Sequence, residues 1–215
     1  MKLHKLIDHT LLSPFAEADQ IKKLCEEAIN HQFYSVCISP YFVPFCRQHL
    51  SASQVRICTV IGFPFGYNSI ASKQRDIDSL LPTVDEFDIV INLQAATNED
   101  FSLIDNEVEL LTKHVQQEGK VVKWIVESGN ISSKHLRILC DIMNKHRPDF
   151  MKTSTGVLGA GASLEAITTM RECLHDQIQI KASGGIRDRQ TALAMIKAGA
   201  SRIGASKSVQ IIGAD

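Results

Sequence analysis

The chain has 215 residues, of which 44% are hydrophobic and 22% are charged, and its formal net charge is −1. The length fits one domain with a sizeable core, and the composition is ordinary for a soluble globular protein. The near-neutral charge argues against a nucleic-acid partner, and no apolar run approaches the roughly 18–20 residues of a membrane span. We therefore expect neither a nucleic acid nor a membrane among its partners.

The N-terminal residues Met1–Asp8 contain no apolar signal-peptide core, which favours a cytoplasmic location. The six cysteines are scattered and lack metal-ligand spacing, so we interpret them as free thiols that mostly fill the core. None of the eight histidines forms a His-x-x-x-His pair. The sequence therefore predicts no metal site.

Short β-rich segments alternate with helical patterns along the whole chain. Eight segments are predicted as strands: Lys5–His9, Tyr34–Ile38, Arg56–Ile61, Phe87–Asn92, Val121–Glu127, Phe150–Thr153, Ile178–Ala182 and Ser201–Gly204. Apolar spacing and capping residues predict helices between them: Asp19–His31, Ser69–Leu81, Asp100–Gln117, Ser132–Lys145, Ser163–His175, and a helix that Asp188 caps and Gly199 follows. Repeated β–α units of this length indicate a parallel sheet with helical crossovers.

Eight such units favour an α/β fold of the compact (β/α)8 TIM-barrel type, forming a single domain over residues 1–215. A doubly wound open sheet is the alternative. Side-chain alternation favours the barrel: in Phe87–Asn92 the phenylalanine and both isoleucines share one face and Asp88 lies on the other. In Val121–Glu127 the tryptophan opposes Lys123 in the same way. A helix-covered open sheet needs two apolar faces, whereas a barrel accepts polar groups on its inner wall near the mouth.

Ionisable residues occupy inner-wall positions on four consecutive predicted strands: Asp88, Lys123, Lys152 and Lys181. Two ammoniums about 6 Å apart repel by roughly 3 kcal/mol at an effective dielectric of about 20, and desolvation adds to this, so one lysine would be largely neutral near pH 7. A neutral amine attacks carbonyls and forms a Schiff base, an electron sink that permits cleavage of a nearby C–C bond. An ion-pair network with a purely structural role is the alternative.

Two glycine-containing turns follow the last two predicted strands, at Ser183–Arg187 and Gly204–Lys207. The loops after strands seven and eight of a barrel frequently form a phosphate site through backbone N–H groups. Ser206, Lys207 and Arg187 would add side-chain donors. The sequence thus predicts an anion site beside the lysines.

In this order, the motifs resemble the deoxyribose-phosphate aldolase family over nearly the whole chain. The resemblance rests on eight segments: Ile7–Leu12, Val36–Pro40, Cys58–Pro64, Phe87–Asn92, Lys123–Gly129, Lys152–Gly156, Lys181–Arg187 and Arg202–Ser206. It implies a class I aldolase with a barrel fold and no cofactor, which reversibly cleaves 2-deoxy-D-ribose 5-phosphate to D-glyceraldehyde 3-phosphate and acetaldehyde. The partners would be these small molecules, with a homodimer as a candidate assembly.

The resemblance also implies roles for individual residues. Lys152 matches the Schiff-base lysine, Lys181 the second lysine that perturbs it, and Asp88 the carboxylate of the proton relay. The other matches are substrate-binding positions: Asp8 and Thr10 at the sugar, Cys37 near the acetaldehyde end, Lys123 near the site, and Gly156, Gly184, Gly185, Gly204 and Ser206 in the phosphate cradle. The family's reaction requires no metal.

Two features depart from the family pattern. Val157 stands where some members carry a lysine, and the three tyrosines lie early in the chain, whereas some members have a tail tyrosine that assists proton transfer. Another Schiff-base phospho-sugar aldolase, a transaldolase-like enzyme and a non-catalytic phospho-sugar binder are the alternatives. The presence of Asp88, Lys152 and Lys181 together argues against the last of these.

Overall fold

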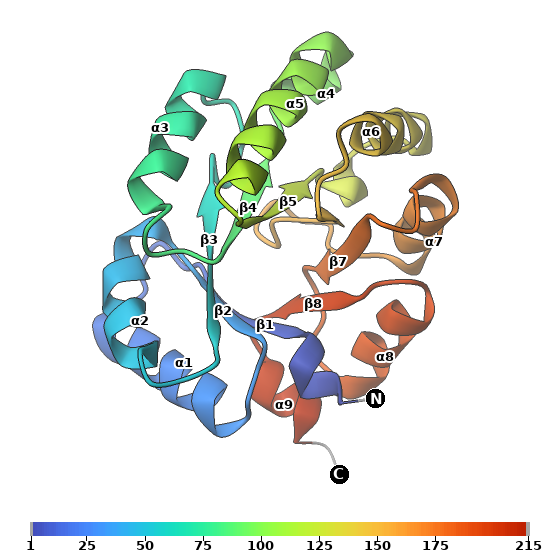
Figure 1. Cartoon of the computed structure of the whole chain (residues 1–215). Helices are drawn as coiled ribbons and strands as arrows, with labels where there is room; N and C mark the ends of the chain where they lie inside the picture. Colours follow the sequence, from blue (N-terminus) through green and yellow to red (C-terminus); the bar gives the residue numbers. More distant parts are fainter. Residues whose placement is uncertain (1, 214–215) are drawn as a thin grey trace.

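In the computed structural model, which describes residues 2–213, eight parallel strands close into a barrel in sequence order. Their bounds are β1 Ile7–Leu11, β2 Ser35–Ile38, β3 Arg56–Ile61, β4 Glu86–Val90, β5 Val121–Ile125, β6 Phe150–Lys152, β7 Gln179–Ser183 and β8 Arg202–Ala205. Figure 1 shows the helices arranged around the outside of this ring. The predicted single-domain barrel is confirmed over the described residues, and the open sheet is excluded because β8 pairs with β1.

The predicted helices are present, and each begins within one residue of its expected start. The helices are α1 Ala18–Asn30, α2 Val43–Leu50, α3 Ile70–Leu80, α4 Leu93–Thr97, α5 Phe101–Gln117, α6 Ser133–His146, α7 Leu164–Cys173, α8 Arg189–Lys197 and α9 Ser208–Ile212. Among the six predicted helices, five have an N-cap side chain that accepts a hydrogen bond from the backbone N–H three residues later: Ser69, Asp100, Ser132, Ser163 and Asp188. These caps explain why the starts could be located from sequence.

Three local differences from the predictions have physical causes. The strand expected from Lys5 begins instead at Ile7, because Leu3–Leu6 forms a 3-10 turn, η1. The strand expected to reach Glu127 ends at Ile125, and Glu127 adopts a left-handed backbone with φ of 55° before the short 3-10 turn η3, Ser128–Asn130. Helix α2, which follows the turn η2 (Pro40–Phe42), was not predicted; its proline lies in the first turn, where the missing N–H has little consequence.

The two faces of the barrel wall differ in character, as the alternation predicts. Phe87, Ile89 and Trp124 are fully buried in the large apolar core between strands and helices. On the inner wall, Cys37 and Cys58 belong to a small separate apolar cluster, and the rest of that wall near the mouth is charged. The apolar outer face binds the helices by hydrophobic burial, which frees the inner face for polar side chains.

The barrel closes within one chain. Three residue pairs join β1 to β8, and one of them sets Asp8 beside Gly204. The last helix, α9, is short, and it is tied to β1 because His9 contacts Ser208 Oγ through Nδ1 at 2.9 Å. The other ring nitrogen of His9 contacts Glu27 of α1 at 2.8 Å. The buried histidine therefore stabilises the seam between the first and last strands.

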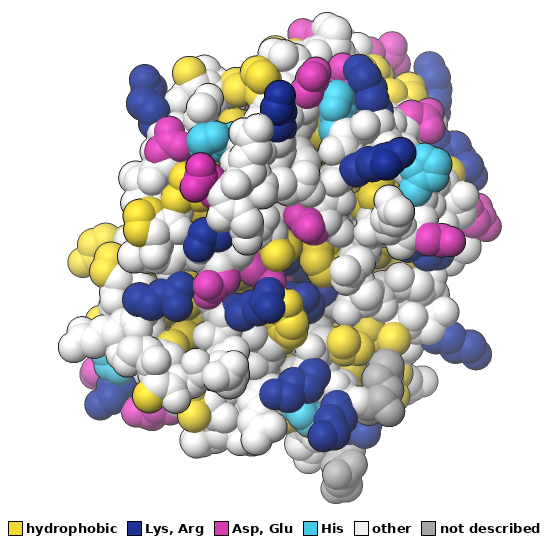
Figure 2. Space-filling view, viewed as in Figure 1, with side chains coloured by type: hydrophobic (Ala, Val, Ile, Leu, Met, Phe, Trp, Pro, Cys, Tyr) yellow, Lys and Arg dark blue, Asp and Glu magenta, His cyan; other side chains and the backbone are white. Residues whose placement is uncertain are grey.

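The surface mixes acidic and basic side chains. On the face shown in Figure 2 both signs are interspersed around the centre. This distribution agrees with a formal net charge of −1. Within residues 2–213, every helix is too short or too polar to cross a lipid bilayer.

Candidate active site

Asp88 is the centre of a buried charged network inside the barrel. Its Oδ2 accepts hydrogen bonds from Lys152 Nζ and Lys181 Nζ, both at 2.7 Å. Its Oδ1 accepts one from Lys123 Nζ at 2.8 Å. All four residues are at most 2% exposed, and they come from β4, β5, β6 and β7. Their predicted position on the inner wall is therefore confirmed, while their roles stay predictions.

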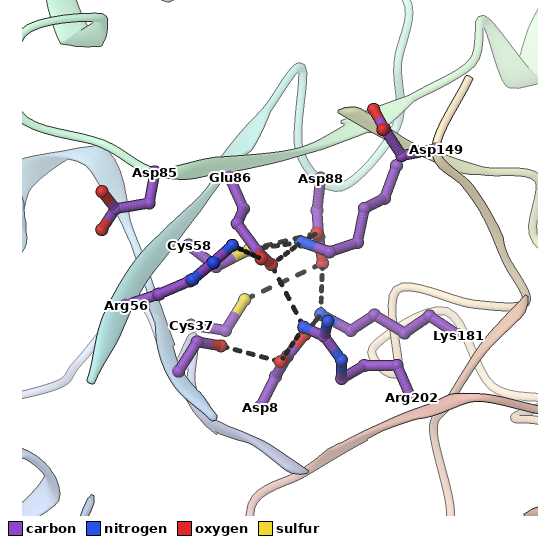
Figure 3. Close-up of polar contacts among 12 residues, drawn as sticks. Asp8, Cys37, Arg56, Cys58, Asp85, Glu86, Asp88, Asp149, Lys181 and Arg202 are labelled. Atoms are coloured by element: carbon purple, nitrogen blue, oxygen red, sulfur yellow. Dashed lines mark hydrogen bonds and ion pairs between the residues drawn. The ribbon is translucent and has the colours of Figure 1, made fainter. Parts of the chain in front are cut away.

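The network contains more carboxylates than the sequence interpretation assumed. We expected one carboxylate among three ammoniums, but Asp8 and Glu86 are also fully buried there, together with the guanidinium of Arg202. Figure 3 shows Asp8, Lys181 and Arg202 converging with the two acidic residues of β4. Asp8 Oδ2 pairs with Lys181 Nζ at 2.5 Å. Attraction to these carboxylates therefore acts on the lysines together with the repulsion between cations.

The carboxylates determine the direction of the pKa shifts. Burial alone would raise the pKa of Asp88, but the ammoniums of Lys123, Lys152 and Lys181 hold it well below 3.8. Burial alone would lower the pKa of Lys181, but Asp8 and Asp88 raise it above 10.5. The pKa of Lys123 is also raised, against burial, chiefly by Asp88. Asp88 is therefore ionised and Lys123 and Lys181 are cationic at neutral pH.

A cavity of about 330 Å³ opens above this network, at the carboxyl ends of the strands. Lys152 is at its base, and the residues predicted for the phosphate cradle and the sugar line its walls: Thr10, Gly156, Gly184, Gly185, Gly204 and Ser206. Arg187 lines it as well, whereas Lys207 lines a different hollow between α1 and α9. Val157, the departure from the family pattern, is at the rim and 53% exposed.

Two glycines of the predicted cradle are required by close packing. Gly184 has φ of +89°, and a Cβ there would lie 2.9 Å from the Cα of Gly161. A Cβ on Gly204 would lie 2.3 Å from Ser183 Oγ and 3.0 Å from Lys181 Cε. Gly204 therefore gives Lys181 the room it needs to reach Asp88, in addition to lining the cavity.

The turn after Lys152 is fixed by a carboxylate that the sequence interpretation left without a role. Glu127 Oε2 accepts a hydrogen bond from the backbone N–H of Thr155 at 2.9 Å, and burial raises the pKa of Glu127. The hydroxyls of Ser154 and Ser183 are buried without a partner among the described residues, and Ser183 also lines the cavity. Unpaired buried hydroxyls beside a cavity are suited to bind the oxygens of a ligand.

Three predicted substrate-binding residues lie below the cavity instead of lining it. Asp8 and Lys123 are occupied in the charged network, and Cys37 Sγ lies 3.9 Å from Asp88 Oδ2. Cys37, Cys58 and Asp88 offer ligand atoms within 4.8 Å of one another. Lys123 Nζ already contacts Cys58 Sγ at 3.3 Å, so a cationic group occupies that position.

A larger hollow of about 830 Å³ adjoins the first and shares Leu12, Ser13, Pro14 and Val157 with it. Its walls carry none of the residues of the charged network. We assign the site to the smaller cavity because chemistry requires convergent polar groups as well as space.

The fold and the site together define an α/β-barrel enzyme built around a buried lysine, the architecture of a class I aldolase. No model of a protein family matches the sequence. Over 211 residues, however, the chain is 42% identical to deoxyribose-phosphate aldolase 1 of Vibrio vulnificus, covering 98% of this chain and 95% of the relative.

Solved structures agree with this likeness. The chain matches a putative deoxyribose-phosphate aldolase from Coccidioides immitis with a TM-score of 0.93 and 31% identity, over 99% of this chain and 85% of that one. It matches the deoxyribose phosphate aldolase of Aeropyrum pernix with a TM-score of 0.91 and 30% identity, over 98% of this chain and 89% of that one. The chain belongs to the deoxyribose-phosphate aldolase family, and it is an aldolase, a carbon–carbon lyase.

Sequence reasoning missed Glu86 and Arg202 as members of the network. Glu86 has the same side-chain parity as Asp88, but the strand was predicted to begin one residue too late, at Phe87. Arg202 has the parity of Gly204 and was noticed only as part of a motif. Extending the strand predicted at Phe87 by one residue would have found Glu86. Arg202 already lay inside the predicted strand Ser201–Gly204, so listing the charged inner positions would have found it.

Proposed function

We propose that the protein reversibly cleaves 2-deoxy-D-ribose 5-phosphate to D-glyceraldehyde 3-phosphate and acetaldehyde through a Schiff base on Lys152. The observation that carries the proposal is the position of one amine. Among the residues that line the cavity, Lys152 is the one whose Nζ reaches Asp88, at 2.7 Å. The relative from Vibrio vulnificus, with 42% identity, supports the choice of substrate.

The ion pairs distinguish Lys152 from the other two lysines of the network. Lys123 pairs with both Glu86 and Asp88, at 2.7 and 2.8 Å. Lys181 pairs with both Asp8 and Asp88, at 2.5 and 2.7 Å. Among the described residues, Lys152 forms an ion pair with Asp88 alone, and it shares that oxygen with Lys181. Of the three lysines, Lys152 therefore has the weakest compensation by carboxylates, which suits it to act as the nucleophile.

The neutral form of the Lys152 amine would attack C1 of the open-chain sugar, and protonation of the resulting carbinolamine with loss of water gives a protonated imine. When the 3-hydroxyl loses its proton, the C2–C3 bond breaks, C3 becomes the aldehyde of glyceraldehyde 3-phosphate, and the electron pair moves into an enamine. Protonation at C2 and hydrolysis then release acetaldehyde. Asp88 Oδ2, shared by Lys152 and Lys181, provides a path for protons between the two amines.

The phosphate would bind at the other end of the cavity. Gly184, Gly185 and Ser206 lie there on the turns after β7 and β8, and Arg187 supplies a cation. Backbone N–H groups of glycine turns form concave sites for anions. Because one cavity holds both this cradle and Lys152, a five-carbon phosphate ester can contact both at once.

The test is cleavage of 2-deoxy-D-ribose 5-phosphate, followed through glyceraldehyde 3-phosphate with a coupled dehydrogenase. Lys152→Met should lower kcat/KM by at least about 1,000-fold, because it removes the nucleophile. Val157→Met, a change at the rim of the same cavity, is the matched control and should retain most of the activity. Cleavage by Lys152→Met at the wild-type rate would overturn the assignment, and ketone donors in place of acetaldehyde would indicate a transaldolase-like enzyme.

We also propose that the reaction proceeds without a metal or an organic cofactor, because Lys123, Lys181 and Arg202 supply the positive charge that a metal would otherwise provide. The homologous enzyme of Aeropyrum pernix is described as a tetramer. This description supports assembly of the present chain into oligomers, with a homodimer as the smallest unit to test. A phosphorylated sugar does not cross membranes unaided, which supports a cytoplasmic site of action.

A further inference from the structure

We propose that Arg202 is a positioning residue for the aldol reaction and that Glu86 acts with it. Arg202 bridges the two carboxylates that hold Lys181 and Lys123 in place, and its permanent charge helps to set the pH range in which the inner network is active. The inference rests on the proposed function, in that it takes Lys152 as the nucleophile.

The geometry places Arg202 one step below the reacting lysines. Its Nη1 donates to Asp8 Oδ1 at 2.9 Å and to Glu86 Oε2 at 3.2 Å. The other oxygen of Asp8 pairs with Lys181, and the same oxygen of Glu86 pairs with Lys123 at 2.7 Å. Figure 3 shows the guanidinium between the two carboxylates. Arg202 thus reaches Asp88 through two independent routes, each made of one carboxylate and one lysine.

The guanidinium is itself fixed in position. It stacks on the ring of Tyr34 at 3.4 Å from the centroid and lies 5.1 Å from the centroid of Phe150. Ser35 Oγ donates to the same Asp8 oxygen at 2.8 Å. Arg202 is 6% exposed, so it is shielded from water. A stacked, planar fork with two carboxylates holds geometry that a flexible ammonium does not.

The positive charge of Arg202 affects the pH dependence of the groups around it. An arginine stays cationic at any pH relevant here, so it favours the neutral form of nearby amines and the ionised form of nearby carboxylates. Glu86 has the opposite effect. The charged and titratable groups around the network come from all sides: Asp8 of β1, Tyr34 before β2, Cys37 of β2, Arg56 and Cys58 of β3, Glu86 and Asp88 of β4, Lys123 of β5, Glu127 after β5, Lys152 of β6 and Lys181 of β7.

The experiment compares Arg202→Gln, Arg202→Lys and Glu86→Gln by the pH profile of kcat/KM for 2-deoxy-D-ribose 5-phosphate. Arg202→Gln removes a positive charge, so amines hold protons to higher pH and the acid limb should move up by about one pH unit. Glu86→Gln removes a negative charge, so the acid limb should move down. Arg202→Lys keeps the positive charge but loses the planar guanidinium. The acid limb should therefore stay at the wild-type pH while kcat falls by about tenfold.

The control is Lys73→Met, which breaks a buried ion pair outside the barrel wall and should leave the limb where it is in the wild type. Opposite shifts for Arg202→Gln and Glu86→Gln support the inference, because damage to the fold alone does not move the limb in two directions. No shift, or shifts in the same direction, would overturn it. If Arg202→Gln does not fold, the other two variants test the inference: the acid limb of Glu86→Gln should move down, and the acid limb of Arg202→Lys should stay at the wild-type position.

Failure of this inference is distinguishable from failure of the proposed function. Reduction of wild-type protein with borohydride in the presence of acetaldehyde should leave an ethyl group on Lys152. If the ethyl group is on Lys152 and the limbs do not move, only the role of Arg202 is wrong. If it is on another lysine, the proposed nucleophile is wrong.

Discussion

The chain buries lysines in two places, and the two arrangements differ. Outside the barrel wall, Lys73 of α3 pairs with Glu107 of α5 at 2.5 Å and donates to the carbonyl oxygen of Val90 at 2.6 Å. The second oxygen of Glu107 accepts from the backbone N–H of Asn92 at 3.0 Å. One cation faces one carboxylate, and both have a further backbone partner.

Inside the barrel, a single carboxylate serves three ammoniums. Asp88 pairs with Lys123, Lys152 and Lys181. Within residues 2–213, only Lys123 and Lys181 form an ion pair with a second carboxylate. The Lys73–Glu107 pair is satisfied and both side chains are fully buried, so the pair ties α3 and α5 to the end of β4. In the network at Asp88, Lys152 shares its carboxylate partner with Lys181, and Lys152 lines a cavity. A lysine that shares its carboxylate partner with another cation and also lines a cavity is suited to react, whereas Lys73, which is fully buried with a carboxylate of its own, is structural.

The largest expected difference between the two places is in turnover. Lys181→Leu should lower kcat by about 100-fold, because it removes the second amine from the proton path through Asp88. Lys73→Leu should lower the free energy of unfolding by about 3–5 kcal/mol, because Glu107 stays buried and unpaired. Its kcat per folded molecule should stay close to wild type. Steady-state kinetics and urea unfolding of both variants check this pair of outcomes, and equal losses of kcat would remove the distinction.

A smaller effect is expected at the phosphate end of the cavity. Ser206→Glu should raise KM for 2-deoxy-D-ribose 5-phosphate by about tenfold, because it places a negative charge beside the anion. KM for unphosphorylated 2-deoxyribose should change much less. Lys207→Glu is the matched control, since that side chain lines another hollow. A rise in KM that is the same for both sugars would place the phosphate elsewhere.

The smallest expected effect is on stability at acid pH. The contributions of Asp88 and Glu107 to the free energy of unfolding should depend on pH with opposite signs. The pKa of Asp88 is lowered, so its contribution to stability is complete above its ordinary value of 3.8 and is lost as the pH falls toward the lowered value. The pKa of Glu107 is raised by burial, so stability is lost as the pH rises from 4.5 through the raised value.

Urea unfolding of wild type, Asp88→Asn and Glu107→Gln across this pH range measures both slopes. Asp88→Asn should flatten the loss of stability on the acid side, and Glu107→Gln should remove the loss that accompanies ionisation of Glu107. If both substitutions change the pH dependence in the same sense, the two buried carboxylates do not differ as described.

Much of the architecture could be predicted from sequence, because short-range rules determine it. Caps such as Ser69 and Asp188 mark helix starts, and alternation in β4 and β5 separates Trp124 from Lys123. Parity also predicted that Asp88, Lys152 and Lys181 face the same space. What parity does not give is distance across the barrel: the pairing of Arg202 with Asp8 joins residues 194 positions apart. The balance of charge around Asp88 could therefore not be counted before the barrel was seen closed.

The same limit explains why two residues predicted to bind the substrate lie in the charged network instead of lining the cavity. Asp8 and Lys123 belong to motifs that resemble the family's substrate-binding positions, and a motif identifies a residue without its depth in the barrel. The structure shows both fully buried, each bonded to a group of opposite charge. Asp8 thus contacts Lys181 and does not line the cavity, and its contact with the sugar stays a prediction.

The most direct test of the central claim is the location of the trapped intermediate. Wild-type protein is incubated with acetaldehyde and borohydride at neutral pH, digested, and mapped by mass spectrometry for the ethyl group that reduction leaves on a lysine. The account predicts that Lys152 carries it, and that Lys73, Lys123 and Lys181 do not. An ethyl group on Lys123 or Lys181, or no labelled lysine in a protein that still cleaves the sugar, would contradict the account.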